Sequence, residues 1–361
     1  MWRITLKRIN ALKQVAFRKD GFNGFLIFNP SNLTYFTGFS GASALLIPDD
    51  GESTVYVYGV NYAHAKTELT SAKVELVKRG ENLIGKIAKQ VQAFKIGKLA
   101  VDALNIEGWR ALARALGGEK MLAADPSFIR ELRKVKDAEE IKLMRKAAEL
   151  TSEGMRVARE TVAAGVREYE VAAEIEYAMR KQGCSGTAFE TIVASGVSSA
   201  FPHGGCSDRQ IREGDLVVVD VGATYEFYRS DMTRTFVAGK PSEKQNKIYQ
   251  IVKTAQDKAF EAVKPNTKAA DVDAVARKVI ADACYGDYFV HNLGHGVGLD
   301  IHEPPTLSPD SKDVLGAGNV VSVEPGIYLV GYGGVRIEDT VLVQKNGAEK
   351  LTNGPYALAK E

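Results

Sequence analysis

Acidic residues interrupt otherwise apolar segments in the second half of the chain. The stretch 217–236, VVVDVGATYEFYRSDMTRTF, has the pattern of two strands, yet it carries Asp220 and Asp231 where a core strand normally carries an aliphatic residue. About a hundred residues later, Glu324 and Glu338 occupy matching places in similar segments. Carboxylates are rarely buried in a sheet without a partner, so this set of four predicts a chemical function.

Four carboxylates in one place need positive charge nearby, because like charges within a few ångströms raise one another's pKa values and oppose folding. Arg229 and Arg336 supply at most two positive charges, whereas two divalent cations balance the four acids fully. Residues two apart in a strand share a face. We therefore expect Arg336 to point the same way as Glu338 and to orient this carboxylate as a metal ligand.

Histidines add further ligand and proton-transfer chemistry. The chain has five histidines, and four lie in this half: His203, His291, His295 and His302. If the start of HNLGHGVGLDIH is extended, His291 and His295 share a face, and the glycines leave the backbone bare for close approach. One imidazole with four carboxylates is an oxygen-rich set that suits Mn²⁺, Co²⁺, Fe²⁺ or Zn²⁺ in a hydrolytic pair.

Simpler explanations exist for each feature taken alone. A single buried aspartate such as Asp220 is more often a hydrogen-bonded structural residue than a ligand. The glycines of GHGVG are also found in phosphate loops, but no Lys-Ser/Thr pair follows them here. His64 is expected to be a surface or satisfied histidine, and the basic run RELRKVK (130–136) is expected to be a solvated helix face or a linker.

The elements that must position these acids occur twice. A helix over 139–162 and a second helix around 171–179 precede the first two acidic segments, and helices over 244–263 and 272–284 precede the other two. The match extends to the motifs [DE]-x-G and R-x-[DE]-x-T. Because the period is longer than that of solenoid repeats, we expect two ααββ units that face each other across a pseudo-twofold axis, where the four acids meet.

The preceding sequence predicts a separate N-terminal domain. Between 24 and 104, short apolar runs alternate with helical or turn segments, which is an α/β pattern. The composition becomes charged between about 125 and 136. A chain of 361 residues usually has two domains, and we expect an α/β domain over 1–128 and an α+β domain over 129–361.

Composition excludes several classes of protein. The 47 Lys and Arg residues against 45 Asp and Glu residues give a formal net charge of +2, so there is no electrostatic reason to expect a nucleic acid or a membrane as a partner. Three cysteines without a C-x-x-C pair indicate free thiols in a reducing compartment. No run approaches the ~18 apolar residues of a membrane span, and the N-terminus lacks the features of a signal peptide. We expect a cytoplasmic protein.

Together these motifs resemble those of a known family. Asp220, Asp231, His295 in GHGVGL, Glu324 in VEPGIY and Glu338 in GVRIED are similar to the dinuclear metallopeptidases of the pita-bread fold, especially the proline-specific branch of prolidase and Xaa-Pro aminopeptidase. The residues before about position 125, which include NLTYFTGFSG, are similar to the N-terminal domain of that branch. Methionine aminopeptidases generally lack this domain, and creatinase lacks the metal-binding acids.

The resemblance implies a role for each residue. Asp231, His295 and Glu324 would hold one metal ion and Asp220 the other, with Asp231 and Glu338 helping to bridge two divalent ions in each subunit. These ions are expected to be Mn²⁺ or Co²⁺, with Zn²⁺ or Fe²⁺ as the alternatives. The resemblance makes Glu324 the acid/base for the attacking hydroxide.

The resemblance also implies a substrate side of the site. There His203 in FPHGG, His291 and His302 would orient the scissile carbonyl. His291 and His302 would also stabilise its oxyanion. Arg336 is the fourth residue expected to bind the substrate. Several short prolidases have an arginine shortly after the HE pair, where it helps to hold the free carboxylate of a dipeptide. Here the run HEPPTLSPDSK places Thr306 at about that position, so the length of the peptide stays open.

These features predict a peptidase that hydrolyses the bond before proline in dipeptides or short peptides and releases the N-terminal residue. Two alternatives are an aminopeptidase without a preference for proline and a non-catalytic binding protein that retained the fold. The family also implies a homodimer in which the aromatic loop TYFTGFSG lies near a partner's active site. Alternatively, Tyr35, Phe36 and Phe39 are ordinary core residues of their own domain.

Overall fold

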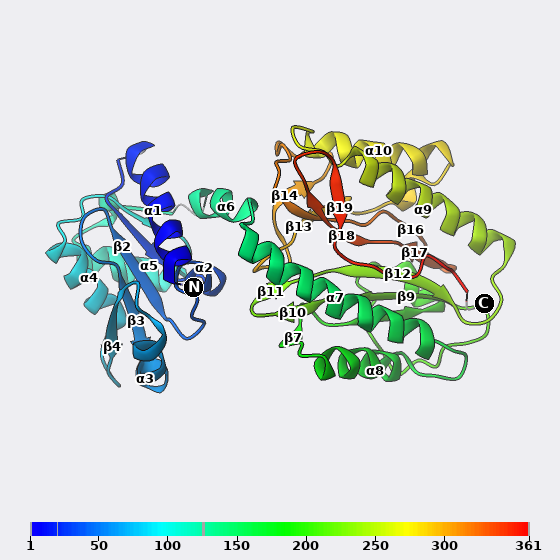
Figure 1. Ribbon diagram of the computed structural model, residues 1–361, viewed down its shortest axis with the longest axis horizontal. Helices are drawn as coiled ribbons and strands as arrows, with labels where there is room; N and C mark the ends of the chain where they lie inside the picture. The colour runs from blue at the N-terminus through cyan, green and yellow to red at the C-terminus, as the bar shows by residue number, and fades with distance from the viewer. Residues whose placement is uncertain (1, 20, 125–126, 360–361) are drawn as a thin grey trace. The chain divides into compact units, whose positions relative to one another are not determined.

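The computed structural model describes residues 2–19, 21–124 and 127–359. The chain divides into two compact units, Met1–Leu132 and Arg133–Glu361, and both contain helices and strands (Figure 1). None of the described helices is long and apolar enough to cross a lipid bilayer.

The N-terminal unit is built on one mixed sheet with the strand order β4-β3-β2-β1-β5-β6. Strand β2 pairs antiparallel with β1 and with β3. The pairs β3–β4, β1–β5 and β5–β6 are parallel. Strands β1 and β2 are buried along their whole length, which explains their unbroken apolar sequences. Its elements are α1 (Trp2–Lys19), β1 (Gly24–Ile27), α2 (Pro30–Thr37), β2 (Ala44–Pro48), β3 (Thr54–Tyr58), α3 (Gly59–Glu68), β4 (Lys73–Val77), α4 (Leu83–Ala93), β5 (Leu99–Val101), α5 (Ile106–Leu116) and β6 (Leu122–Ala124); α6 (Ser127–Lys134) includes the boundary.

The aromatic side chains of the loop TYFTGFSG belong to the core of this unit. Tyr35 and Phe36 lie in α2 and are buried, as is Phe39. The ring centroids of Tyr35 and Phe36 are 5.0 Å apart, and the ring of Phe39 packs edge-on against that of His64 with a centroid distance of 5.2 Å. Of the two alternatives, the structure therefore supports ordinary core packing, and this loop gives no argument for a dimer.

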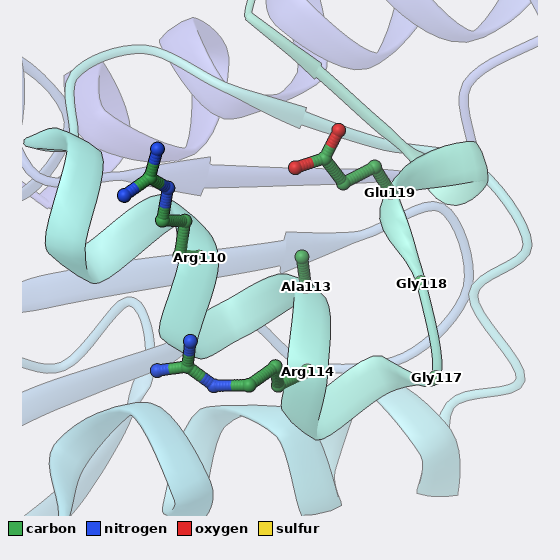
Figure 2. A pocket seen from close by; sticks show the side chains of 6 residues that line it. All are labelled: Arg110, Ala113, Arg114, Gly117, Gly118 and Glu119. Atoms are coloured by element: carbon green, nitrogen blue, oxygen red, sulfur yellow. The ribbon is translucent and has the colours of Figure 1, made fainter.

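A surface pocket of the N-terminal unit lies at the C-terminal end of α5. Figure 2 shows the residues that line it, which are Arg110, Ala113, Arg114, Gly117, Gly118 and Glu119. None of the acids or histidines predicted to carry chemistry is among them, so the predicted site belongs to the C-terminal unit.

The C-terminal unit consists of two helix pairs with strands between them (Figure 1). Helix α7 (Ala138–Thr161) packs on α8 (Glu168–Lys181), and α9 (Glu243–Ala262) packs on α10 (Ala269–Asp282). In Figure 1 the first pair covers the lower side of the strands and the second pair the upper side. The helices expected from the repeat are therefore confirmed, and a buried apolar core lies against each pair.

Capping signals in the sequence account for the starts of two of these helices. The Asp137 side chain accepts hydrogen bonds from the backbone of Glu139 and Glu140, and the Glu140 side chain accepts one from the backbone of Asp137. Ser242 and Gln245 form the same capping box at α9. A side-chain cap stabilises a helix by about 1 kcal/mol.

Within the described residues, the strands of this unit form four small sheets, ordered β11-β10-β7, β12-β9-β8, β14-β13-β15-β18-β19 and β16-β17. Their bounds are β7 (Gly186–Thr187), β8 (Ile192–Ser195), β9 (Leu216–Val221), β10 (Ala223–Tyr225), β11 (Tyr228–Arg229), β12 (Met232–Val237), β13 (Gly294–Gly296), β14 (Glu303–Leu307), β15 (Val320–Val323), β16 (Gly326–Leu329), β17 (Gly333–Arg336), β18 (Asp339–Val343) and β19 (Ala348–Lys350). The unit is thus α+β, as predicted.

Of the four predicted acids, Asp220 alone lies inside a strand, where it pairs with Thr233. Asp231 precedes β12, Glu324 follows β15 and Glu338 lies between β17 and β18. The prediction that strands carry all four acids is wrong in this detail. At these positions the backbone leaves its own ladder, and the amide of Glu338 instead donates to the carbonyl of Thr233 at 3.0 Å. Three of the acids thus lie directly beside strand ends, and Asp220 lies one residue before the end of β9.

Candidate metal centre

The two halves of the C-terminal unit meet through two equivalent residue pairs, Asp231 with Thr340 and Glu338 with Thr233. The hydroxyl of Thr340 accepts from the amide of Asp231 at 3.0 Å and donates to its carbonyl at 2.7 Å. At the equivalent place in the repeat, the amide of Glu338 donates to the carbonyl of Thr233, and the Thr233 hydroxyl donates to Oε2 of Glu338 at 2.6 Å. These contacts fit the predicted pseudo-twofold axis and bring an acid of each half to it.

Strand β13 places His295 against two of the acids. Its Nε2 lies 3.2 Å from Oε1 of Glu324 and 3.6 Å from Oδ2 of Asp231. Its Nδ1 lies 3.1 Å from the carbonyl oxygen of Gly296, so a proton on Nδ1 leaves Nε2 available as a metal ligand. The hydroxyl of Ser322 accepts from the amide of His295 and donates to Oε1 of Glu324, both at 3.0 Å, and thereby fixes both residues.

Arg336 holds a different acid from the one expected. Its Nη2 donates to Oδ2 of Asp220 at 2.7 Å, its Nη1 to the hydroxyl of Tyr328 at 2.8 Å, and its Nε to the hydroxyl of Thr233 at 3.0 Å. Its guanidinium is connected to Glu338 through the Thr233 hydroxyl. The prediction that Arg336 orients Glu338 directly is therefore wrong, because β17 ends at Arg336 and the alternation of a strand does not continue to Glu338.

Bringing the carboxylates together in a buried place favours the protonated forms of Asp231 and Glu338. Burial, followed by the charge of Asp220, raises the pKa of Asp231 well above its ordinary value. Burial, followed by the charges of Asp231 and Glu324, does the same to the pKa of Glu338. Like charges in a buried place have this effect whenever positive charge is in short supply.

His295 and Glu324 form an ion pair within this cluster. Burial opposes the charge on His295, but the hydrogen bond and charge of Glu324 raise its pKa to about 9. Burial also opposes the charge on Glu324, and the same contact with His295 lowers its pKa nonetheless. Arg336 is a second cation in contact with the acids, whereas the Nε of Arg229 is buried without a partner among the described residues. Two positive charges against four carboxylates leave the cluster short of positive charge.

The cluster has the donor atoms that a divalent cation requires. Three of its oxygens are buried without a hydrogen-bond partner among the described residues: Oδ1 of Asp220, Oδ1 of Asp231 and Oε1 of Glu338. Such atoms cost free energy unless a cation faces them. Ligand atoms of Asp231, His295 and Glu338 lie within 4.8 Å of one another, and Glu324 contacts the same imidazole. Carboxylate oxygens with one imidazole suit hard or borderline divalent ions, so these residues fit a metal centre.

The other three predicted histidines lie around this cluster. Nε2 of His291 is 2.9 Å from the hydroxyl of Tyr328. The ring centroids of His302 and His295 are 4.2 Å apart. Burial, followed by the charge of His295, lowers the pKa of His302. Nη1 of Arg336 donates to the carbonyl of Pro202 at 3.3 Å, so His203, the next residue, lies beside the same cluster. The structure thus brings the three histidines to one site with the metal-binding group.

Two glycines let β13 approach its neighbours closely. A Cβ at Gly294 would lie 2.1 Å from the carbonyl oxygen of Ser322, and a Cβ at Gly296 would lie 2.4 Å from the carbonyl oxygen of Glu303. The expected close approach of the backbone is therefore confirmed. The strand begins only at Gly294, however, so the extended segment does not reach back to His291 as expected.

Tyr328, Thr233 and Ser322 are site residues that the sequence analysis did not assign. The buried Tyr328 hydroxyl connects His291 to Arg336, and burial raises its pKa to about 12. Two sequence features could have identified the first two residues. Tyr328 is the last residue of VEPGIY, and Thr233 is the threonine that the repeat preserves in R-x-[DE]-x-T. No pattern singled out Ser322, whose role depends on the packing of β15 against β13.

Two family models match the chain. Residues 142–345 match metallopeptidase family M24, and residues 8–135 match the creatinase/prolidase N-terminal domain. The chain belongs to metallopeptidase family M24. It is therefore a metal-dependent enzyme that hydrolyses peptide bonds, and the resemblance predicted from the motifs is confirmed.

Relatives of this M24 peptidase span almost its full length. A Xaa-Pro dipeptidase of Pyrococcus furiosus is 44% identical over 328 residues, which are 90% of this chain and 92% of the relative. The prolidase structure from Pyrococcus horikoshii matches with a TM-score of 0.91 at 39% identity and covers 98% of this chain and 99% of that one. An X-Pro aminopeptidase structure from Thermotoga maritima matches with a TM-score of 0.86 at 36% identity and covers 95% and 99%. The predicted pita-bread architecture with its α/β N-terminal domain is confirmed.

Proposed function

We propose that this M24 peptidase hydrolyses the bond between the first residue and proline in dipeptides or short peptides. The observation that carries the proposal is the meeting of three histidines with a metal-binding group of four acids and His295 at one site. The Xaa-Pro dipeptidase from Pyrococcus furiosus, which is 44% identical, supports proline at the second position.

The metal centre would hold two divalent ions, Mn²⁺ or Co²⁺, with Zn²⁺ or Fe²⁺ as the alternatives. Asp231, His295 and Glu324 would hold one ion and Asp220 the other, and Asp231 and Glu338 would contribute to holding both. The three buried carboxylate oxygens that have no hydrogen-bond partner among the described residues support this arrangement. When bound, such ions polarise the scissile carbonyl and lower the pKa of water toward ~7.

The residues of the chain would then supply orientation and proton transfer. The carboxylate of Glu324 accepts the proton of the attacking water and later returns it to the leaving nitrogen. His302 donates a hydrogen bond to the oxyanion, and His203 helps to orient the carbonyl. His291 lines the same side of the site, where its ring nitrogens bond with Asn292 and Tyr328. Arg336 keeps Asp220 in place through the bond of 2.7 Å.

The far end of the substrate would face Thr306 instead of an arginine. Thr306 is half-buried in β14, where its amide donates to Asp313 at 3.1 Å. A dipeptide presents its proline carboxylate close to the metal centre, and this charge needs a cationic partner, whereas a tripeptide presents an amide there. We therefore expect Xaa-Pro-Yaa tripeptides to be cleaved with a kcat/KM at least comparable to that of dipeptides. The similarity to an X-Pro aminopeptidase structure fits this expectation.

We further propose that residues 1–128 form the N-terminal domain and 129–361 the catalytic domain of a cytoplasmic homodimer. The support is the family resemblance of the sequence motifs. Light scattering on the purified protein tests the dimer, and a monomeric mass together with full activity would contradict it.

A substrate panel tests the proposed function. A Xaa-Pro dipeptide, a Xaa-Pro-Yaa tripeptide and a proline-free control are each assayed with Mn²⁺, Co²⁺ and Zn²⁺ in turn. We expect hydrolysis of both proline peptides and little of the control. Equal hydrolysis of the control would indicate an aminopeptidase without a preference for proline, and no hydrolysis of any peptide by metal-loaded protein would indicate a non-catalytic relative.

A further inference from the structure

We infer that the basic run at the start of the C-terminal unit positions His302 and Thr306, an inference that rests on the substrate roles proposed above. The sequence predicted that Arg133, Lys134 and Lys136 lie on a solvated helix face or in a linker. This is wrong for two of them, because Arg133 is 7% and Lys136 is 4% exposed. Lysine and arginine are almost never buried unless they are paired, so their partners identify their role.

Glu303 is a partner of both buried cations. Nζ of Lys136 lies 2.8 Å from Oε1 of Glu303. Nη2 of Arg133 donates to Oε2 of Glu303 and, at 2.7 Å, to Oδ2 of Asp300. The amide of Asp300 donates to Oε2 of Glu303 at 3.3 Å and so links the two ends of the segment 300–303. Two buried cations thus meet two carboxylates.

A buried group of ions is a weak source of stability, because removing each ion from water costs several kcal/mol and the mutual attraction offsets this cost only with good geometry. What these ion pairs do fix is the conformation of the four-residue segment 300–303. Its third residue is His302.

His302 depends on this segment for its position. Its ring centroid lies 4.2 Å from that of the metal-binding His295. No hydrogen bond to the His302 ring is found in the part of the chain that the structure describes. The ring is therefore placed by the backbone that carries it. Asp300 and Glu303 hold that backbone on both sides of His302.

The same basic run holds the segment that carries Thr306. Nζ of Lys134 lies 2.7 Å from Oδ1 of Asp313, and Oδ2 of Asp313 accepts from the amide of Thr306 at 3.1 Å. Strand β14 is thus held at Glu303, where it begins, and at Thr306, one residue before it ends. Arg133, Lys134 and Lys136 act as positioning residues for both substrate-side features.

A double-mutant cycle between Glu303→Gln and His302→Ala tests this inference in the full-length, metal-loaded protein. Misplacing a group that contacts the reacting atoms by ~1 Å can cost on the order of 100-fold. We expect Glu303→Gln to lower kcat/KM for a Xaa-Pro dipeptide by ~10 to 100-fold, mainly through kcat, with unchanged metal content. In the His302→Ala background the loss should shrink to less than about threefold. Equal losses in both backgrounds would overturn the inference.

Asp273→Asn is the matched control. Asp273 is also a buried carboxylate in an ion pair, with Arg277 at 2.7 Å, but it accepts from the amide of Leu293 at 3.0 Å and so holds the segment between His291 and His295. Its effect on kcat/KM should therefore be the same with or without His302. A loss that disappears in the His302→Ala background would contradict the assignment of Glu303 to His302.

Two further variants separate positioning from stability. Lys136→Met combined with Glu303→Gln removes both charges of one ion pair, so the melting temperature should recover while kcat stays low; recovery of both would overturn the inference. If Glu303→Gln does not fold, Glu303→Asp, which keeps the charge but shortens the side chain, replaces it in the cycle with the same expectations.

Hydrogen exchange provides a readout that does not need a substrate. In Glu303→Gln, the amides of 300–303 and Thr306 should exchange faster than in the wild type, whereas Asp273→Asn should leave them unchanged. Unchanged exchange in Glu303→Gln would overturn the inference. If the wild type cleaves no Xaa-Pro peptide, the proposed function fails, and exchange still decides whether the basic run holds this segment.

Discussion

The hydroxyl of Thr233 lies between Arg336 and Glu338, accepting a hydrogen bond of 3.0 Å from Nε of the arginine and donating one of 2.6 Å to Oε2 of the glutamate. The other oxygen of Glu338, Oε1, is buried without a partner among the described residues. One hydroxyl therefore fixes the glutamate on one side, so that its second oxygen faces the metal centre.

Thr233→Val should misorient Glu338 while keeping the shape of the side chain. We expect kcat/KM to fall by ~10 to 100-fold, because partners that orient metal ligands typically have effects of this size. Steady-state kinetics with a Xaa-Pro dipeptide and metal analysis measure the effect.

Thr235→Val is the control for this substitution. Thr235 is another buried threonine of β12, but its hydroxyl bonds with the backbone of Arg336 and contacts no carboxylate. Its loss should lower the melting temperature by a similar amount with less than about a threefold change in kcat/KM. Equal catalytic losses in the two variants would mean that Thr233 acts only through stability.

Tyr328→Phe should separate His291 from Arg336. The lost hydroxyl leaves two buried polar groups without their partner, which typically costs ~1 to 3 kcal/mol, and we expect kcat/KM to fall by ~10-fold or more. Tyr249→Phe is the matched control, because the buried hydroxyl of Tyr249 has no hydrogen-bond partner among the described residues. A catalytic loss in Tyr249→Phe as large as that in Tyr328→Phe would contradict the proposed role of Tyr328.

Removal of the metal ions should destabilise the protein more at high pH than at low pH. In the metal-free protein the pKa of His295 rises from 6.5 to about 9, so its contribution to stability is complete below pH 6.5 and is lost as the pH rises through 9. The pKa values of Asp231 and Glu338 are also raised above their ordinary range, and their contribution is lost in the same direction.

Bound ions replace these protons, so the melting temperatures of metal-loaded and chelator-treated protein should diverge between pH 6.5 and 9. Each ion at a hundredfold excess over its Kd would add about 2.7 kcal/mol. Thermal melts at several pH values measure the difference, and a difference that is constant or shrinks with pH would contradict the charge balance described for the cluster.

Thr306→Arg should shift the substrate preference toward dipeptides. The Thr306 contact with Asp313 uses the backbone, so the substitution leaves this contact intact and adds a cation for the proline carboxylate. We expect the ratio of dipeptide to tripeptide kcat/KM to rise by up to ~10 to 100-fold, the effect of a hydrogen bond to a charged group. Thr306→Gln, which is long but uncharged, should not shift the ratio. A wild-type enzyme that cleaves dipeptides and not tripeptides would show that another residue holds the carboxylate.

The sequence was sufficient to predict the duplicated α+β unit, because helix periodicity and the R-x-[DE]-x-T repeat are local patterns. It also predicted that acids and histidines meet, since buried carboxylates in this number need a cation. The partner of Arg336 was not predictable, because β17 ends at this residue and its side chain crosses to Asp220, 116 positions away in the sequence.

The basic run was misread for a similar reason. Charged residues at the end of a helix normally face water, and only the fold shows that Glu303 and Asp313 lie opposite Arg133, Lys134 and Lys136. Contacts between segments so far apart in the sequence leave no periodic signal.

We propose that hydrolysis depends on two divalent ions held by four carboxylates and His295. Titration of metal-stripped protein with Mn²⁺, with bound metal and Xaa-Pro hydrolysis measured in the same samples, tests it most directly. We expect no hydrolysis by the stripped protein and full activity when two ions are bound per chain. Full hydrolysis by protein without bound metal would contradict it.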